Sequence, residues 1–193
     1  MTREERVEIS QNPNTPGETL VELSRDGDWL VRRNVAGNPS TPQEILVKLS
    51  RDQDEEVRGY AAKNPSTSIE TLVELSRDQD YDVRRQVAGN PNTPPENLTE
   101  LSRDEEVLVR VYAAWNPNTP PENLAELSRD EHYWVSSNVA GNTNTPVAIL
   151  VKLSRDQDER VRESVADNPK WIRLKEMGIL DQAIAVSKYL GIL

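Results

Sequence analysis

Residues 12–37 read NPNTPGETLVELSRDGDWLVRRNVAG, and residues 38–63 read NPSTPQEILVKLSRDQDEEVRGYAAK. The second stretch repeats the first without insertion or deletion, and the 26-residue unit continues along the chain, with repeats one to six beginning at residues 12, 38, 64, 90, 116 and 142. The tetrapeptide Leu-Ser-Arg-Asp begins at Leu23, Leu49, Leu75, Leu101, Leu127 and Leu153. A fixed period of this length is typical of stacked supersecondary units. The sequence therefore predicts a repeat array.

The first half of each repeat predicts a short helix. In repeat one, Thr15 is placed to cap the free amides, Pro16 suits the first helical position, and Glu18 completes a capping box. Leu20 and Leu23 follow with the i,i+3 spacing of a helical apolar face. Repeat three lacks the proline and repeat six lacks the glutamate.

The second half predicts another short helix. It is expected to begin after Asp26 as the N-cap, with Asp28 in its first turn, and to end at Gly37 before the next Asn-Pro. Val31 and Val35 lie on its core face. Helices of about ten residues do not persist alone, so each repeat needs its neighbours.

An acid four residues before an arginine recurs in this second helix, as in Asp28 and Arg32. This order favours an i,i+4 ion pair within the helix. In repeat five both positions change together, to His132 and Ser136, which suggests that the two positions touch. Because the carboxylates are copied along the array and are not an unlike pair in a pocket, we interpret them as structural.

Two motifs together resemble the leucine-rich repeat variant family: Asn-Pro-x-x-Pro-x-x-x-Leu-x-x-Leu-x-x-Asp and the following Val-Arg-x-x-Val-Ala-x-Asn, repeated over roughly residues 12–168. The resemblance implies an all-α, right-handed solenoid with two short helices per repeat, one of them 3₁₀ in character. One family member carries an iron–sulfur cluster on a Cys-rich N-terminal segment. This chain has no cysteine, so the iron–sulfur cluster is not carried over and thiolate metal sites are excluded. The single histidine, His132, offers at most one metal ligand, so no cofactor and no metal are expected.

The expected organisation has three parts. Residues 1–11 form an N-terminal cap, residues 12–169 form the six-repeat helical solenoid, and residues 170–193 form a C-terminal helical cap broken near Gly178. An amphipathic partner-binding tail is the alternative for the last segment.

Composition excludes several function classes. A formal charge of −10, from 33 acidic and 23 basic residues, argues against a nucleic-acid ligand, which needs a basic face. No run of 18 apolar residues predicts a membrane span, and the first residues do not read as a secretory signal. No phosphate loop, zinc-protease motif or serine-nucleophile motif occurs, so an enzyme is not expected. The absence of cysteine fits a cytoplasmic protein best.

The variable face of the second helix is the candidate site. Helical periodicity places the positions equivalent to 29, 30, 33 and 37 opposite the core, and there several repeats carry aromatic, apolar or arginine side chains. The predicted partner-binding residues are Trp29, Leu30, Arg33, Tyr81, Arg85, Val107, Leu108, Val111, Trp115, Tyr133 and Trp134. For Tyr60 and Tyr112, core packing and surface exposure are both open, since each precedes an alanine where other repeats have valine.

Three functional interpretations follow. The preferred one is recognition of a protein or peptide by this face, centred on repeats three to five. The alternatives are a homo-oligomer that buries the same surface, and an engineered consensus scaffold with diversified surface positions. The near-identity of the repeats fits recent duplication and consensus design equally well.

Overall fold

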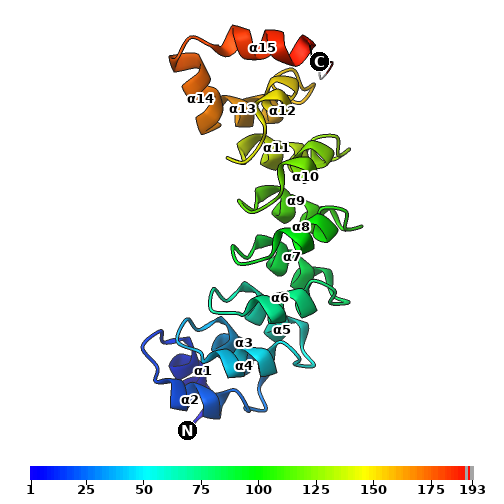
Figure 1. Cartoon of the computed structure of the whole chain (residues 1–193). Helices are drawn as coiled ribbons and strands as arrows, with labels where there is room; N and C mark the ends of the chain where they lie inside the picture. The colour runs from blue at the N-terminus through cyan, green and yellow to red at the C-terminus, as the bar shows by residue number, and fades with distance from the viewer. Residues whose placement is uncertain (190, 192–193) are drawn as a thin grey trace. The chain divides into compact units, whose positions relative to one another are not determined.

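The computed structural model describes residues 1–189 and residue 191, and its secondary structure over these residues is entirely α-helical (Figure 1). The expected cap at 170–193 thus includes three positions outside the described residues: 190, 192 and 193. The chain divides into two compact units, Met1–Asn97 and Leu98–Leu193, which we describe separately. The described helices include none that is long and apolar enough to cross a membrane.

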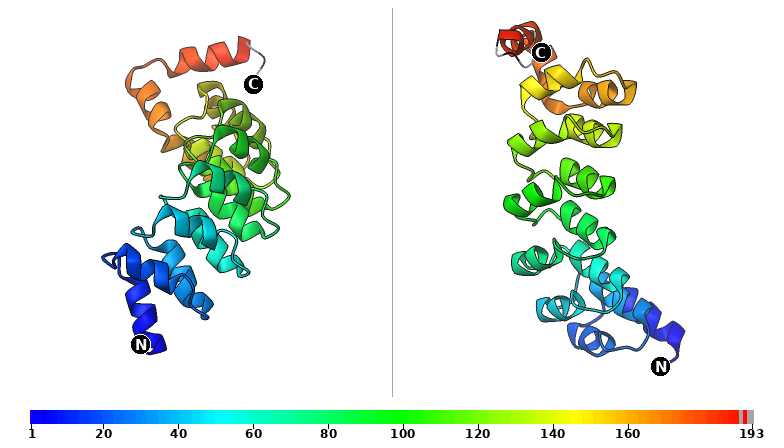
Figure 2. Two further views of the ribbon diagram at one scale, coloured as in Figure 1. Left: turned by 60° about the horizontal axis from the view of Figure 1, so that its bottom comes forward. Right: turned by 90° about the vertical axis from the view of Figure 1, so that its right-hand side faces the viewer.

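The first unit contains one leading helix and three helix pairs. Helix α1 (Arg3–Gln11) is followed by the pairs α2 (Gly17–Leu23) and α3 (Trp29–Gly37), α4 (Gln43–Leu49) and α5 (Glu55–Lys63), and α6 (Ile69–Leu75) and α7 (Tyr81–Gly89). The longer helices pack in series, α1 on α3, α3 on α5 and α5 on α7. They form one layer and the shorter helices form another (Figure 2).

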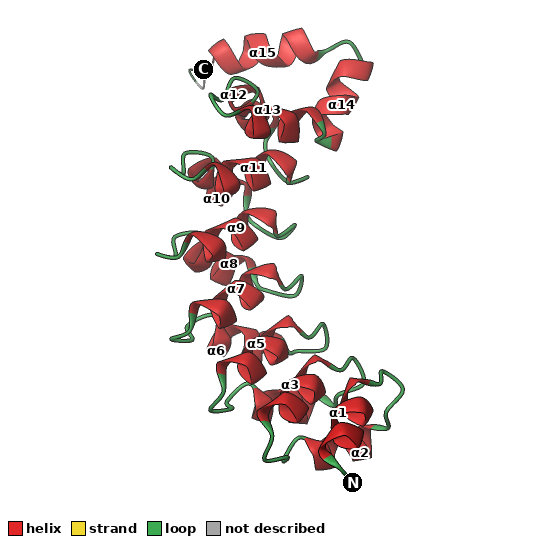
Figure 3. Ribbon diagram, turned by 180° about the vertical axis from the view of Figure 1, so that it is seen from behind, coloured by secondary structure: helices red, strands yellow, loops and turns green. Residues whose placement is uncertain are grey.

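The second unit repeats this arrangement and ends differently. After α8 (Pro95–Leu101), which begins before the unit boundary, come α9 (Val107–Trp115), α10 (Pro121–Leu127), α11 (Tyr133–Gly141), α12 (Val147–Leu153) and α13 (Glu159–Ala166). Helices α9, α11 and α13 pack in series. Helices α14 (Pro169–Glu176) and α15 (Leu180–Tyr189) follow, joined through Gly178 with φ of 68°, and α15 lies against α12 (Figure 3).

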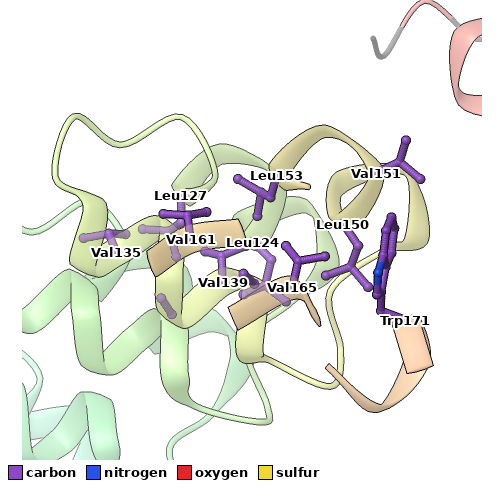
Figure 4. Close-up of a cluster of buried hydrophobic side chains, with 12 residues drawn as sticks. Leu124, Leu127, Val135, Val139, Leu150, Val151, Leu153, Val161, Val165 and Trp171 are labelled. Atoms are coloured by element: carbon purple, nitrogen blue, oxygen red, sulfur yellow. The ribbon is translucent and has the colours of Figure 1, made fainter. Parts of the chain in front are cut away.

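The core is built from the apolar positions that the periodicity selects. In repeat one, Leu20, Val31 and Val35 are completely buried, and their equivalents are buried along the chain. Figure 4 shows this layer in the second unit, where the Trp171 ring packs beside Leu150. Each such side chain stabilises the fold by about 1.5–3 kcal/mol relative to exposure. The all-α fold of two short helices per repeat is therefore confirmed.

Both helices of each described repeat are α-helices. The first helix begins with tight i,i+3 bonds, such as Ile45 N to Pro42 O at 2.9 Å, but also closes i,i+4 bonds such as Leu46 N to Pro42 O at 3.1 Å. The 3₁₀ helix implied by the family resemblance is therefore not seen in the described residues. Seven residues suffice for an α-turn once the neighbouring repeat packs against it.

The expected caps are wrong in two places. Thr15 does not cap α2: its hydroxyl donates to the Ile9 carbonyl at the end of the preceding helix, as Thr41 does to Val35. These threonines are buried, so their hydroxyls satisfy carbonyl groups that the helix end leaves free. Where serine replaces the proline, Ser68 does cap its helix, accepting from the Thr71 amide at 3.3 Å.

The N-cap of the second helix is Asp28, not Asp26. Asp28 accepts from the Leu30 amide at 3.0 Å, whereas Asp26 accepts from the Asp28 amide at 2.9 Å and so shapes the turn before the helix. The helix therefore begins at Trp29, two residues later than expected.

The asparagine of each Asn-Pro links neighbouring repeats. Asn64 Nδ2 donates to the carbonyl oxygens of Ala36 at 2.7 Å and Asn38 at 2.9 Å. Asn142 makes the same two bonds to the previous repeat, although threonine follows it in place of proline. The recurring element is thus the buried asparagine side-chain amide, which hydrogen-bonds each of these repeats to the repeat before it.

The expected i,i+4 ion pair between Asp28 and Arg32 is wrong. Arg32 Nε and Nη2 donate to Asp52 of the next repeat at 2.7 and 3.0 Å, and Nη1 donates to the carbonyls of Asp26 and Gly27 at 2.8 and 3.2 Å. Burial alone would raise the pKa of Asp52, but the hydrogen bonds from Arg32 and the Asp54 amide hold it below its ordinary value. Asp28 instead caps the helix through Oδ1 and accepts from Arg3 Nε through Oδ2.

Candidate functional site

The predicted residues of repeats four and five lie on α9 and α11 in the second unit. We name them the aromatic patch, comprising Val107, Leu108, Val111, Trp115, Tyr133 and Trp134. Trp115 and Trp134 are 59% and 45% exposed. Val107, Val111 and Tyr133 are half-buried against the core, and Leu108 is also half-buried, so the face that periodicity placed opposite the core is only partly exposed at these residues. Their apolar atoms are partly used by the packing of α9 on α11.

A cavity of about 350 Å³ lies within the patch. It is lined by Val111, Tyr112, Trp115 and Asn138. Asn138 stands in repeat five where repeat four has Tyr112, so a small side chain faces a large one and leaves space between them. The Asn138 amide nitrogen donates to the Trp134 carbonyl at 2.8 Å, which fixes its orientation.

Sequence reasoning did not select Tyr112 or Asn138 for the binding site. Tyr112 is half-buried, between the two placements left open for it. The signal that could have found the cavity is the alternation of large and small residues at this repeat position: Asn34, Tyr60, Gln86, Tyr112, Asn138 and Ser164.

A cluster of three rings opens α11. His132 Nδ1 accepts from the Trp134 amide at 3.4 Å, and the His132 ring lies 4.7 Å from the Trp134 ring centroid. The Trp134 indole nitrogen donates to the Tyr133 hydroxyl. The Arg160 guanidinium carbon lies 3.4 Å from the Tyr133 ring centroid. His132 thus serves as the N-cap of α11 and contacts the neighbouring rings.

In the first unit, the predicted residues form two smaller groups. Arg33 lies between the rings of Trp29 and Tyr60, with its guanidinium carbon 5.5 and 4.8 Å from their centroids. Trp29 is exposed, whereas Leu30 and Arg33 are half-buried. Tyr60 also packs against the core, which settles its placement as a bridge between core and surface.

The second group lies on α7. Tyr81 is exposed, and Arg85 pairs with Asp82 at 2.7 Å. The charge of Asp82 raises the pKa of the Tyr81 phenol above its ordinary value. Arg33 and Arg85 are thus each held by a ring or an acid of their own unit.

Comparison with known proteins identifies the fold family. The family model for the leucine-rich repeat variant matches residues 29–54 and 81–106. A solved structure described as a leucine-rich repeat variant with a novel repetitive protein structural motif is 30% identical, with a TM-score of 0.60, covering 95% of this chain and 81% of that chain. The chain belongs to the leucine-rich repeat variant family.

Two further solved structures similar to this leucine-rich repeat variant chain are described as engineered proteins. One is 20% identical with a TM-score of 0.48, covering 97% of this chain and 67% of that chain. The other is 19% identical with a TM-score of 0.39, covering 95% and 88%. The comparison with curated proteins finds no match. The family assignment rests on the 30% identical structure and the repeat motif, and it names no partner.

Proposed function

We propose that this leucine-rich repeat variant chain is a non-catalytic scaffold that binds a protein or peptide through the aromatic patch of α9 and α11. The observation that carries the proposal is the exposure of Trp115 beside the 350 Å³ cavity. Tryptophan is one of the residue types enriched in binding hot spots, which cluster in pockets that a partner desolvates.

Folding of the repeat does not require Trp115. The equivalent positions of the other repeats carry Gly37, Lys63, Gly89, Gly141 and Asp167. All of these occur in the same helical context without a large apolar side chain. A soluble monomer has no folding reason to expose an indole here, which supports a role in contact with another molecule.

The cavity chemistry favours recognition over catalysis. Val111, Tyr112 and Trp115 offer apolar and aromatic surface, and Asn138 supplies a polar group. This lining contains no carboxylate, thiol or imidazole that could act as an acid, base or nucleophile. An apolar or aromatic side chain of a bound peptide fits such a pocket, where it would contact the Trp115 ring.

Charge further narrows the partner class. The chain carries a formal charge of −10, which repels a phosphate backbone and attracts basic segments. We therefore favour a peptide or protein surface with an apolar anchor and neighbouring basic residues.

The proposal is tested by selecting peptides from a displayed random library on the immobilised full chain. The control is the double variant Trp115→Lys, Trp134→Glu, because repeat two carries Lys63 and Glu56 at these positions. Peptides with apolar anchors are expected to bind the wild type about 100-fold more tightly than the variant. Selected peptides that bind both proteins equally would show that the site lies elsewhere.

Light scattering on the same two proteins distinguishes binding of a different partner from self-association through the aromatic patch. A wild-type monomer leaves the patch free for a different partner, as the proposal requires. A wild-type dimer that becomes a folded monomer in the variant would instead make the patch a self-association surface.

A further inference from the structure

The arginine and aspartate that join neighbouring repeats form a ladder along each unit. In the first unit the rungs are Arg6 with Asp26, Arg32 with Asp52, and Arg58 with Asp78, at 2.6, 2.7 and 2.7 Å. In the second unit Arg110 makes the rung to Asp130 at 2.7 Å. Its Nη1 also donates to the carbonyls of Asp104 at 2.8 Å and Glu105 at 3.0 Å.

One rung is missing from the second unit. Repeat five carries Ser136 where the other repeats carry the arginine, while Asp156 is retained at the acceptor position. Among the described residues, no lysine or arginine nitrogen lies within 4.0 Å of the Asp156 carboxylate. Asp156 Oδ1 accepts only from the Asp158 amide, at 2.9 Å, which is the turn bond made in every repeat.

A cavity occupies the place of the missing side chain. It has a volume of about 480 Å³, and its lining includes Asp130, Glu131, Tyr133, Ser136, Asp156 and Asp158. Asp130 and Glu131 are the equivalents of Asp104 and Glu105, whose carbonyls accept from Arg110 Nη1 one repeat earlier. The cavity therefore brings together the residues equivalent to those whose carboxylate and carbonyl groups accept from Arg32, Arg58 and Arg110.

The neighbouring cations are already engaged. Arg110 pairs with Asp130, and Arg160 pairs with Asp158 at 2.7 Å while lying over the Tyr133 ring. Arg162 donates to the carbonyls of Asp156 at 2.7 Å and Gln157 at 3.0 Å, which is the backbone half of its own rung. Asp156 is thus left without a cation among the described residues.

We propose that this cavity binds a guanidinium group in place of the absent arginine. The planar fork of a guanidinium can donate two parallel bonds to Asp156 and further bonds to the carbonyls of Asp130 and Glu131, as Arg110 does one repeat earlier. An ammonium is a point donor and matches this set less well. The inference rests on the ladder, and not on the proposed binding of a peptide by the aromatic patch.

Calorimetric titration of the full chain tests the proposal with three matched probes: the N-acetyl amides of arginine, lysine and citrulline. The arginine probe is expected to bind with one site per chain, the lysine probe at least about tenfold more weakly, and the uncharged citrulline probe without measurable saturation. Equal binding of arginine and lysine, or no saturable binding of arginine, would overturn the proposal.

A second titration shows whether the guanidinium belongs to a polypeptide or to a small molecule. A Gly-Arg-Gly tripeptide amide that binds more tightly than free arginine assigns the cavity to an arginine residue of a polypeptide. Tighter binding of free arginine assigns it to a small guanidinium compound. Both results support the shared chemistry.

Three variants test whether the arginine probe binds at the missing rung. Ser136→Arg is expected to fill the cavity from within, to remove binding and to raise the thermal midpoint. Asp156→Asn is expected to weaken the arginine probe at least about tenfold. Arg110→Ser opens an equivalent gap one repeat earlier, and a stoichiometry of two is expected from it. Unchanged binding by folded Ser136→Arg would contradict the assignment even if Arg110→Ser failed to fold.

Discussion

The ring of Tyr60 covers Gly37 so closely that a Cβ at position 37 would stand 2.7 Å from Tyr60 Cδ1. Tyr60 of repeat two thus fills the space that a glycine in repeat one leaves open. At Gly141 such a Cβ would meet nothing within 4 Å among the described residues, and repeat six has Ser164 in place of the tyrosine. The pairing explains why glycine and tyrosine recur together in successive repeats.

We predict opposite effects for the two glycine-to-alanine substitutions. Gly37→Ala forces the Tyr60 ring to move and is expected to lower the free energy of unfolding by about 1–3 kcal/mol. Gly141→Ala adds helix propensity without a clash and is expected to raise it by up to about 1 kcal/mol. Urea denaturation measures both, and an equal effect at the two positions would contradict the packing relationship.

The buried asparagines that hydrogen-bond neighbouring repeats, which we call the asparagine ladder, predict a large and a small loss of stability for two substitutions in one repeat. Asn142→Ala removes three hydrogen bonds: two to the buried carbonyls of Ala114 and Asn116, and one that Asn142 Oδ1 accepts from the Asn144 amide. The expected cost is about 2–4 kcal/mol. Asn144→Ala removes one exposed bond to the Pro117 carbonyl and is expected to cost at most about 1 kcal/mol. Thermal and urea unfolding compare them; similar losses would refute the ladder's role.

For the arginine rungs, we predict that burial determines how much an ion pair contributes to the free energy of unfolding. The side chains of Arg58 and Asp78 are 9% and 10% exposed, so Arg58→Ala leaves a buried carboxylate uncompensated and is expected to cost about 3–5 kcal/mol. Arg103 and Glu126 are 60% and 52% exposed, and Arg103→Ala is expected to cost less than about 1 kcal/mol. Urea denaturation midpoints measure the difference, and a costly Arg103→Ala would oppose this account.

Acid should weaken the first unit through Asp52. Its pKa lies below the ordinary value of 3.8 because the hydrogen bonds from Arg32 and the Asp54 amide outweigh burial. A lowered pKa in the folded state contributes stability that is present above the unfolded pKa and is lost as pH falls through the folded one. The free energy of unfolding is therefore expected to fall below about pH 4. Asp52→Asn should show a shallower acid dependence, and an unchanged slope would argue against this linkage.

The helical periodicity of the sequence predicted the core residues, but it did not predict the side-chain contacts between repeats. Leu20, Val31 and Val35 were identified because burial of a helix face follows the 3.6-residue period. The partner of Arg32 was assigned wrongly because an acid four residues earlier offers an obvious pair, whereas Asp52 becomes a neighbour only when the repeats stack. The roles of Thr15 and Asn64 were missed for the same reason, since their acceptors belong to neighbouring repeats or helix ends.

The candidate site was predicted only in outline. The variable face identified Trp115 and Trp134, which are exposed, but it did not reveal that Val107 and Val111 also pack against the core. A helical wheel sorts residues on one helix and contains no information about the neighbouring helix. The cavity beside Asn138 depends on such a pairing of adjacent repeats.

We propose that Trp115 and Trp134 contact a partner and do not stabilise the fold. The most direct measurement compares wild type with Trp115→Lys, Trp134→Glu for both unfolding free energy and affinity for a library-selected peptide. We predict a change in unfolding free energy within about 0.5 kcal/mol, as for ordinary surface substitutions, together with a loss of affinity of about 100-fold. A variant that unfolds readily, or one that keeps its affinity for the peptide, would contradict the account.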